Sequence, residues 1–383
     1  MALSWLERYM EYTKEFESPS SFHYWSAVWA IGSAVGRRIW TRVGTEIHFP
    51  STYTILVSPS AISRKSTAMN KAIGILRKIG DVNFMLDKMT DAGLWKTMVD
   101  LDEKYGMAEL VVHADELSMM FANDTWTKDV ISSLTRIYGA GDLITKTLAS
   151  LGTMEIHEPC INFLAGTTPT DLAIIFPGAT TGMGFSGRCL FIFEKGPRFR
   201  NPEPHLLLQH EQPLVIELRK MRERKGEIPI TPTAQAFYND WYMKAPKLIA
   251  DDADSSFLAR AHIHILHLAL ILTLAKGNSE ISRENMVEAE KQLRHIIGNL
   301  QNTICRVGVS GAIADTDRLI GMLEKLGGTA TKSQLLKMRR LDRRQIEEAA
   351  QTLRERNMLS SEWRASSKRP ALCYRLLKGE DSE

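Results

Sequence analysis

The chain has 383 residues, of which 44% are hydrophobic and 24% are charged. This length and composition predict two or three globular domains with ample cores, while the net charge of +3 is too small to indicate a partner. The four cysteines form no CxxC pair, which excludes a zinc ribbon and a disulfide framework and predicts a cytoplasmic protein. The most apolar stretch, residues 257–274, contains Arg260 and three histidines, so no membrane span is expected.

The first predicted element is a helical segment over residues 1–45. Charged side chains occur within its first eight residues, which is too early for a secretory signal peptide. Its apolar face includes Trp25, Trp29 and Trp40. We expect this face to pack on the domain that follows.

An α/β core is predicted for residues 46–204, and it begins with a candidate phosphate-binding loop. Residues 54–57 form an apolar strand, residues 58–64 a tight loop, and Lys65 opens a helix. In a P-loop, backbone N–H groups and the positive helix N-terminus hold phosphates, a Lys reaches the β- and γ-oxygens, and a Ser or Thr hydroxyl binds Mg²⁺. The candidate ATP-binding residues are Ser60, Ser63, Arg64, Lys65, Ser66 and Thr67, with Ser66 as the metal ligand.

This loop lacks the usual glycines. Ser58 or Pro59, Ala61, Ser63 and Arg64 stand in their places. Glycine suits positions where the backbone approaches phosphate closely or adopts a positive φ, so these substitutions put the loop geometry in question. A surface loop before an amphipathic helix is the alternative interpretation.

Two later strands of the core end in polar residues. Residues 110–114 are mostly apolar and lead into Asp115 and Glu116. An Asp in this place can hold Mg²⁺, and the adjacent Glu can orient the attacking water in phosphoryl transfer. Residues 160–166 lead to Thr167, a candidate for contacting the γ-phosphate or that water. Solvated strand ends are the alternative interpretation of both.

Arg188 stands directly ahead of a further apolar strand, residues 189–193. An Arg in this place can be an arginine finger that reaches the nucleotide of a neighbouring subunit, although a surface ion-pair partner is the simpler alternative. Between the strands of residues 110–114 and 160–166, residues 143–157 contain two β-prone runs and predict a hairpin that carries Lys146. An ordinary hairpin at the edge of the fold, without a functional contact, is the alternative interpretation.

A helical pattern covers residues 205–305, after a connector rich in Pro and Arg at residues 195–204. A separate small domain is then predicted for residues 312–378, with three helices followed by two short strands. That order resembles a winged helix-turn-helix. The span has a net charge of about +7, which favours phosphate contacts, although a protein-docking module is the alternative. The candidate DNA-binding residues are Arg339, Arg340, Arg343, Arg344, Lys368 and Arg369.

Three short motifs resemble a known family. They are residues 22–25 through Arg38, residues 47–50, and residues 184–188. Together they resemble the ATPase domain of phage and plasmid replication proteins related to primase-helicases, over roughly residues 15–300. The Arg188 element also resembles the arginine finger of MCM-type and superfamily 3 AAA+ helicases.

The resemblance implies an AAA+ type P-loop NTPase that forms a ring, expected to be a hexamer, and moves single-stranded DNA with ATP and Mg²⁺. It implies a sensor 1 role for Thr167, a lid over residues 205–305 in which Arg260 contacts nucleotide, and a hairpin that touches DNA through Lys146. The winged helix is expected to bind duplex DNA, and priming is assigned to another polypeptide. The alternatives are a helicase loader or initiator ATPase, and a regulator that binds nucleotide without hydrolysing it.

Overall fold

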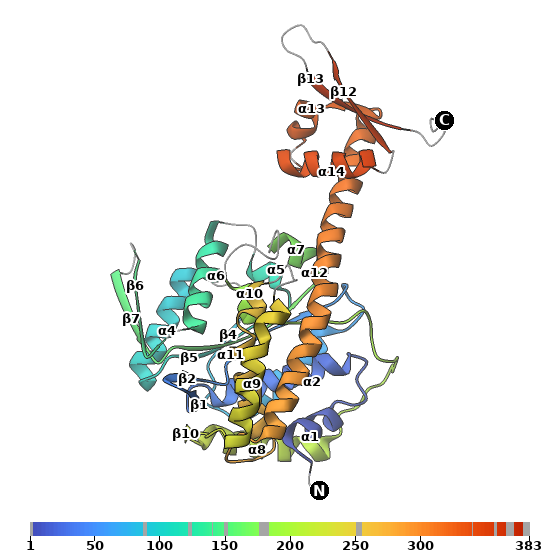
Figure 1. Ribbon diagram of the computed structural model, residues 1–383. Coiled ribbons are helices and arrows are strands. Elements are labelled where there is room, and N and C mark those ends of the chain that lie inside the picture. The colour runs from blue at the N-terminus through green and yellow to red at the C-terminus, as the bar shows by residue number, and fades with distance from the viewer. Residues whose placement is uncertain are drawn as a thin grey trace. The chain divides into compact units, whose positions relative to one another are not determined.

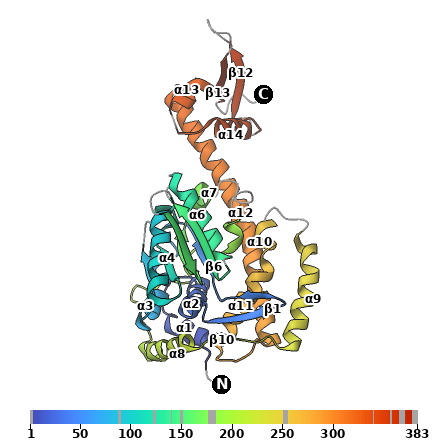
Figure 2. The same cartoon turned by 90° about the vertical axis from the view of Figure 1, so that its left-hand side faces the viewer.

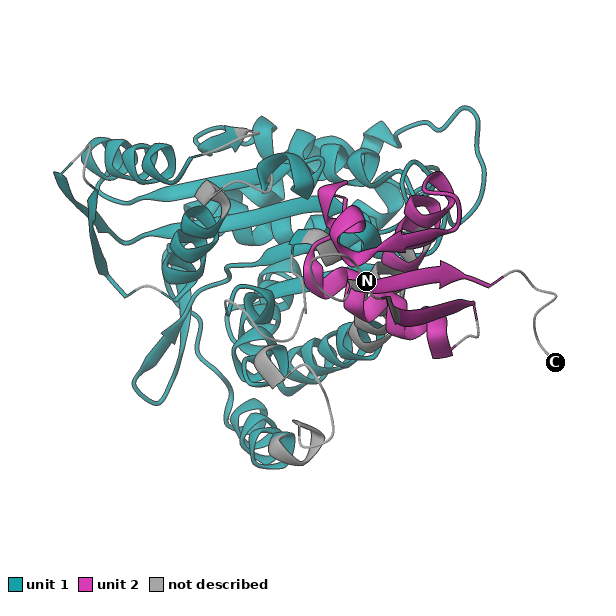
Figure 3. Cartoon of the chain, turned by 90° about the horizontal axis from the view of Figure 1, so that it is seen from above, with its two compact units in different colours: residues 1–303 teal, residues 304–383 magenta. Residues whose placement is uncertain are grey.

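The computed structural model describes residues 3–86, 90–121, 125–139, 141–148, 152–175, 184–249, 255–338, 340–355, 358–364 and 371–377. The chain divides into two compact units, unit 1 (residues 1–303) and unit 2 (residues 304–383), which are coloured in Figure 3. Unit 1 therefore contains three of the four predicted pieces, namely the N-terminal segment, the α/β core and the helices predicted as a lid.

A five-stranded parallel sheet forms the centre of unit 1 (Figure 1). Its strand order is β4-β5-β8-β3-β9. All residues of β3 and β8 are buried, as expected for a parallel sheet covered on both faces. The strands are β3 (Tyr53–Val57), β4 (Phe84–Leu86), β5 (Glu109–Ala114), β8 (Cys160–Thr167) and β9 (Cys189–Phe193).

The strand order creates a topological switch between β3 and β8. The chain leaves β3 towards the β4 edge, whereas it leaves β8 towards β9 on the other side. Right-handed crossovers place these two connections on opposite faces of the sheet. In open α/β sheets, ligands bind outside the carboxyl ends of the strands at such a switch. The helices of the core are α3 (Lys65–Lys78), α4 (Asp91–Tyr105), α5 (Leu117–Met120), α6 (Thr125–Tyr138) and α7 (Pro169–Ile175).

The N-terminal segment packs into unit 1 through α1 (Trp5–Tyr12) and α2 (Ser20–Val35). Trp25 and Trp29 are almost fully buried, as the sequence predicts. Helix α2 lies so close to the core that a Cβ on Gly32 would be 2.3 Å from the carbonyl oxygen of Pro50. The helix ends at Val35, and the predicted helical pattern to residue 45 gives way to strands β1 (Ile39–Val43) and β2 (Glu46–His48), because β-branched residues there pair in a hairpin.

The helices predicted as a lid pack directly on this core. Helix α8 contacts α1, α2 and α3, and α11 contacts α2 and β1, beside the β1-β10 pair in Figure 2. The predicted connector is also anchored, because Arg198 donates hydrogen bonds to the carbonyl oxygens of Phe16 and Thr13. The elements after β9 are η2 (Leu208–His210), α8 (Glu211–Glu223), β10 (Gly226–Glu227), α9 (Pro232–Ile249), α10 (Ser255–Leu258), α11 (Ala261–Ala275) and α12 (Arg283–Lys325), which crosses the unit boundary, whereas η1 (Ser186–Arg188) lies directly before β9.

Unit 2 has the end of α12, two further helices and an antiparallel sheet of order β11-β13-β12. Strand β11 is only three residues long and was missed by the sequence pattern. Two capping boxes begin the helices, one from Thr331 to Gln334 and one from Asp342 to Gln345. The remaining elements are β11 (Thr329–Thr331), α13 (Lys332–Lys337), α14 (Arg343–Glu355), β12 (Leu359–Arg364) and β13 (Ala371–Leu376).

A compact apolar core holds unit 2 together, and its members include Leu323, Leu335, Ile346, Leu353 and Tyr374. Within the described ranges of the whole chain, no helix is both long and apolar enough to cross a membrane.

Candidate nucleotide site

The predicted site residues of the phosphate-binding loop and of the next two strand ends meet at the carboxyl ends of β3, β5 and β8. The three strands are parallel and adjacent in register, so their ends lie at one edge of the sheet. Gly166 shows how closely they converge, because a Cβ there would be 2.7 Å from the carbonyl oxygen of Asp115 and 3.5 Å from Cε of Lys65. A residue larger than Gly at this position would separate the loop from the end of β5.

Lys65 is held inside the loop. Its side chain is only 8% exposed, and Nζ donates to the carbonyl oxygen of Ser58 at 2.9 Å and to Ser58 Oγ at 3.3 Å. Burial lowers the pKa of Lys65, while the nearby charges of Glu116 and Asp171 raise it. The ammonium group of Lys65 therefore lies at the end of β3, and a phosphate ligand would have to replace its two bonds to Ser58.

The loop adopts the backbone conformation that glycine favours, although it has no glycine. Ala61 has φ +60° and Arg64 has φ +47°, both in the left-handed region. This conformation costs a non-glycine residue about 1–2 kcal/mol. Contacts with the N-terminal segment hold Arg64 there, since Ser18 Oγ donates to its carbonyl oxygen at 3.0 Å and its guanidinium pairs with Glu17. Strain that surrounding contacts maintain is typical of functional loops.

The other predicted loop residues differ in accessibility. Ser60 is exposed at the loop tip, whereas Ser63 is buried and its Oγ has no hydrogen-bond partner among the described residues. Ser66 and Thr67 lie half-buried in the first turn of α3. That turn has unpaired backbone N–H groups and the positive end of the helix dipole, both of which favour an anion.

Asp115 and Glu116 follow β5 as predicted. Asp115 is exposed, and Glu116 is half-buried. Burial raises the pKa of Glu116, the Lys65 charge opposes this, and Asp171 raises it further. Glu116 Oε1 is buried and accepts no hydrogen bond from the part of the chain that the structure describes. This oxygen is therefore a free acceptor beside Lys65.

Asp171 is a site residue that the sequence reasoning missed. It lies in the first turn of α7, where Thr168 Oγ1 donates to its Oδ2 at 2.8 Å and its own N–H donates to Thr168 Oγ1 at 3.1 Å. The available signal was Thr168-Pro169 three residues ahead of an Asp, a typical helix start after a strand. Thr167, the predicted γ-phosphate contact, is fully buried, and its hydroxyl is directed to the carbonyl oxygen of Thr168 at 3.4 Å.

Arg188 lies at the amino end of the parallel strands, whereas Lys65 follows the carboxyl end of β3. Cys189 pairs with Tyr53, so Arg188 is level with the residue before β3, about 20 Å along the strand from Ser58. Its Nη1 donates to the carbonyl oxygen of Gly184 at 2.5 Å, and its Nε is buried without a partner among the described residues.

Arg260 lies beside Arg188. Both guanidinium groups approach Gly184, where an added Cβ would be 3.0 Å from Arg188 Nη1 and 3.8 Å from Arg260 Nη2. Burial lowers the pKa of Arg188, and the charge of Arg260 lowers it further. The family resemblance predicted that Arg260 contacts the same nucleotide as Lys65, whereas Arg260 lies beside Arg188.

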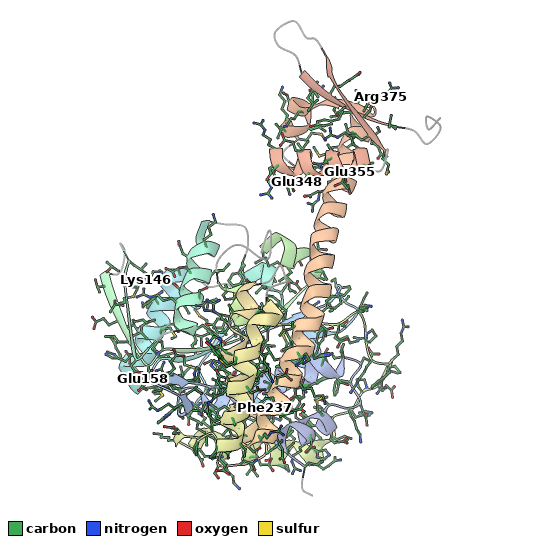
Figure 4. The ribbon with its side chains drawn as sticks, viewed as in Figure 1. Lys146, Glu158, Phe237, Glu348, Glu355 and Arg375 are labelled. Carbon is green, nitrogen blue, oxygen red and sulfur yellow. The ribbon has the colours of Figure 1, made fainter. Side chains whose placement is uncertain are left out.

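The predicted hairpin is present as β6 (Leu143–Leu148) and β7 (Gly152–His157). Lys146 lies on β6 (Figure 4), and its Nζ donates to Asp91 Oδ2 at 2.6 Å and to Ser133 Oγ at 3.0 Å. Asp91 is 7% exposed. The charge of Lys146 therefore anchors the hairpin to α4, and a DNA phosphate would have to compete with Asp91 for this partly buried ammonium group.

The predicted DNA-binding residues of unit 2 lie only partly within the described residues. Arg340, Arg343 and Arg344 are exposed, and Arg344 pairs with Glu348, labelled in Figure 4, at 2.6 Å. Gln345 uses its side chain in the cap of α14 and in a bond to Asp315, so it is not presented to a base. The predicted residues Arg339, Lys368 and Arg369 lie outside the described ranges.

A divalent cation at the first site would have few protein ligands. Within the described ranges, no group of three or more His, Cys, Asp and Glu side chains could hold a metal ion. Ser66 and the exposed Asp115 fit the chemistry of Mg²⁺, which takes one or two protein oxygens together with water and substrate phosphates.

No protein-family model matches the chain, and no curated protein matches it.

Proposed function

We propose that the chain is an ATP-driven DNA motor of the AAA+ type, the replicative helicase of a phage or plasmid-like element. The observation that carries this proposal is the convergence of Lys65, Asp115 and Glu116 at the switch point of a five-stranded parallel sheet. A buried Lys at the start of the helix after β3 and two carboxylates at the end of β5, one strand further along the sheet, are the groups that phosphoryl transfer requires. The resemblance to phage replication ATPases supports the same reading.

The loop residues have distinct roles in this proposal. Lys65 binds the β- and γ-phosphates after it leaves Ser58, and the backbone N–H groups of residues 60–67 surround the phosphate oxygens. Ser66 and Asp115 would hold Mg²⁺, which neutralises charge on the phosphates when it is bound. Glu116 orients the attacking water. Because Thr167 is buried, we assign its expected role at the γ-phosphate to the neighbouring hydroxyl of Thr168.

The motor is proposed to work as a ring. Arg188 is about 20 Å from its own loop along β3, so it can reach a phosphate only in a second copy of the chain. Arg260 lies beside it and would contact the same nucleotide. Two residues along the chain from Arg260, the ring of His262 meets the ring of Tyr242 edge to face, and Tyr242 and Met243 are 48% and 76% exposed. Exposed apolar side chains around a charged pair favour a subunit contact.

Unit 2 is proposed to be a winged helix that binds duplex DNA. Three helices, with one strand of an antiparallel sheet after the first helix and two strands after the third, support this proposal, as does the excess of basic residues. Arg340, Arg343 and Arg344 are exposed at or near the start of α14. With Gln345 engaged in the helix cap, we expect contacts to phosphates and little base selectivity.

Steady-state ATP hydrolysis, with and without single-stranded DNA, tests the motor. We expect DNA to stimulate the wild type, and both Glu116→Gln and Arg188→Ala to abolish the stimulation. Arg136→Ala, at an exposed Arg on α6, is the matched control and should leave turnover unchanged. Mixing the two inactive variants should restore part of the activity, because some interfaces then pair an intact Glu116 with an intact Arg188. A strand-displacement assay on the same preparations separates a helicase from a loader.

The glycine-poor loop favours a second function, a regulator that binds nucleotide as a switch without hydrolysis. Ala61 and Arg64 hold the loop in a strained conformation, and Lys65 already has partners inside the loop. A wild type that binds ATP and hydrolyses none under any DNA condition would overturn the motor and support the regulator.

A further inference from the structure

The start of helix α3 is fixed by a contact from outside the helix. Arg64 precedes the helix, and its side chain makes no hydrogen bond to the first turn. In most helices a Ser, Thr, Asp or Asn side chain at this position makes such a bond. Here the carbonyl oxygen of Arg64 accepts a hydrogen bond from Ser18 Oγ at 3.0 Å, in addition to those from the N–H groups of Thr67 and Ala68. The backbone at residue 64 therefore depends on the N-terminal segment.

The two residues of that segment that contact Arg64 are themselves firmly held. Ser18 is fully buried, and the side chain of Glu17 is 13% exposed. Glu17 pairs with the guanidinium group of Arg64, and its Oε1 accepts the backbone N–H of Asn201 at 2.9 Å. The carbonyl oxygen of Glu17 also accepts the N–H of Arg198 at 3.0 Å. Glu17 and Ser18 thus form a clamp on Arg64, and the connector anchors this clamp.

The clamp opposes the conformational preference of Arg64. With φ +47°, Arg64 is in the left-handed region, which glycine adopts freely and a residue with a Cβ adopts at a cost. The C=O and N–H of a planar trans peptide group point in opposite directions. Because Ser18 fixes the direction of the C=O of Arg64, it also fixes the N–H of Lys65, which is among the groups proposed to surround the phosphates.

We propose that Glu17 and Ser18 are positioning residues for nucleotide binding. They hold the loop, through Arg64, in the backbone conformation that a glycine would adopt without support. The N-terminal segment thereby gives a loop without glycine the shape that phosphate binding needs. This inference rests on the proposed function only in that ATP binds at the loop. The clamp acts on the backbone of residue 64, and no proton moves in this role.

A pair of variants at residue 64 tests the conformational part of the proposal. Arg64→Gly and Arg64→Ala both lose the guanidinium group, so any contact of that group with ATP is lost equally from both. They differ only in the Cβ. We expect Arg64→Gly to bind AMP-PNP, a non-hydrolysable ATP analogue, about five- to thirtyfold more tightly than Arg64→Ala, as measured by calorimetry with Mg²⁺ present.

Double-mutant cycles test whether the clamp acts through Arg64. Ser18→Ala should weaken AMP-PNP binding by the wild-type chain about two- to tenfold, the equivalent of one hydrogen bond. The same change in the Arg64→Gly background should cost less than about twofold, because glycine populates positive φ without support. Glu17→Gln should weaken binding by the wild type and have no further effect in Arg64→Ala, which lacks the guanidinium group that Glu17 holds.

Ser4→Ala is the matched control for general loosening of the N-terminal segment. It removes the hydroxyl that caps α1, so it should lower stability and leave the affinity for AMP-PNP unchanged. The Arg64 side chain is 59% exposed, so both variants at that residue should fold even where Ser18→Ala does not.

Two results would overturn the positioning role while the nucleotide site stands. One is equal affinity for AMP-PNP in Arg64→Gly and Arg64→Ala, and the other is the same loss from Ser18→Ala in the wild type and in Arg64→Gly. A wild type that binds no AMP-PNP would overturn the nucleotide site and the positioning role together. Binding by the wild type alone therefore distinguishes the two failures.

Discussion

The two units of the chain handle charge in opposite ways. In unit 1, Lys65 is 8% exposed as a residue, and its ammonium group contacts the loop backbone under the influence of two acidic side chains. In unit 2 the side chains of Arg343 and Arg344 are 79% and 86% exposed and pair with glutamates one turn along the same helix. Buried charges interact strongly because the local dielectric is low, whereas exposed pairs are screened and exchange partners easily.

The two units are therefore sensitive to different kinds of substitution. Unit 1 depends on a set of buried polar groups whose partners must all be in place. Unit 2 presents exposed charges, and a phosphate backbone can replace their glutamate partners at a small cost in free energy. Changes to the first unit should therefore have large effects on fold and turnover, and changes to the second should be graded and sensitive to salt.

Low pH is expected to produce the largest difference in stability between the two units. Burial lowers the pKa of His23 and His267 to about 3 and that of His264 to about 4, from 6.5. Because the unfolded chain binds these protons more readily, stability is complete above pH 6.5 and is lost as pH falls towards 4. The loss is roughly 1.4 kcal/mol per pH unit for each histidine.

Residues 304–383 contain no histidine, so unit 2 should keep its amide protection where unit 1 loses it. Hydrogen exchange of the full chain at pH 7, 6 and 5 measures both units in one sample. Equal losses in both units would contradict the contrast.

Lys65→Ala should cause the largest loss of function. Without the ammonium group at the phosphates, ATP turnover should fall by about 10²-fold or more. Duplex binding by unit 2 should not change, because its basic residues are separate. Lys96→Ala, at an exposed Lys on α4, is the control. A simultaneous loss of duplex affinity in the Lys65 variant would mean that the two functions are coupled.

Gly166→Ala tests how tightly the strand ends meet in unit 1. The new Cβ would be 2.7 Å from the carbonyl oxygen of Asp115, so the backbone must shift. We expect a loss of about 1–3 kcal/mol in unfolding free energy together with slower turnover. Gly74→Ala in α3 meets no atom within 4 Å and should stabilise the chain by about 0.5–1 kcal/mol. Urea unfolding measures the free-energy change in both variants. An unchanged unfolding free energy in Gly166→Ala would show that the strand ends have room to separate.

Arg343→Ala and Arg344→Ala should have the smallest effects. Each is expected to lower duplex affinity a few-fold and to reduce the salt dependence of binding by about one unit of slope, because each loses one phosphate contact. Arg318→Ala, at an exposed Arg paired with Asp315, serves as the control. Affinity and slope come from fluorescence anisotropy at several salt concentrations. An unchanged slope in both variants would favour a protein-docking role for unit 2.

The local pattern of the sequence was sufficient for most of the elements. Alternation and apolar runs predicted the strands at residues 54–57, 110–114 and 160–166, and helix caps predicted the order of helices in unit 2. These features depend on neighbours within a few residues, which the sequence displays directly. The strand of residues 39–43 was missed because its partners are β2 and the distant β10.

Partners that are distant in the chain were decided by the tertiary structure alone. The sequence placed Arg260 with Lys65 and left Lys146 free, whereas folding brings Arg260 to Arg188 and ties Lys146 to Asp91. Folding also places Asp171, at the start of α7, where it raises the pKa of Glu116, an effect that no local spacing encodes. Local sequence patterns were enough to place charged residues at strand and helix ends. Only the strand order of the sheet decided which of those ends meet, because long-range contacts are selected by packing and not by local pattern.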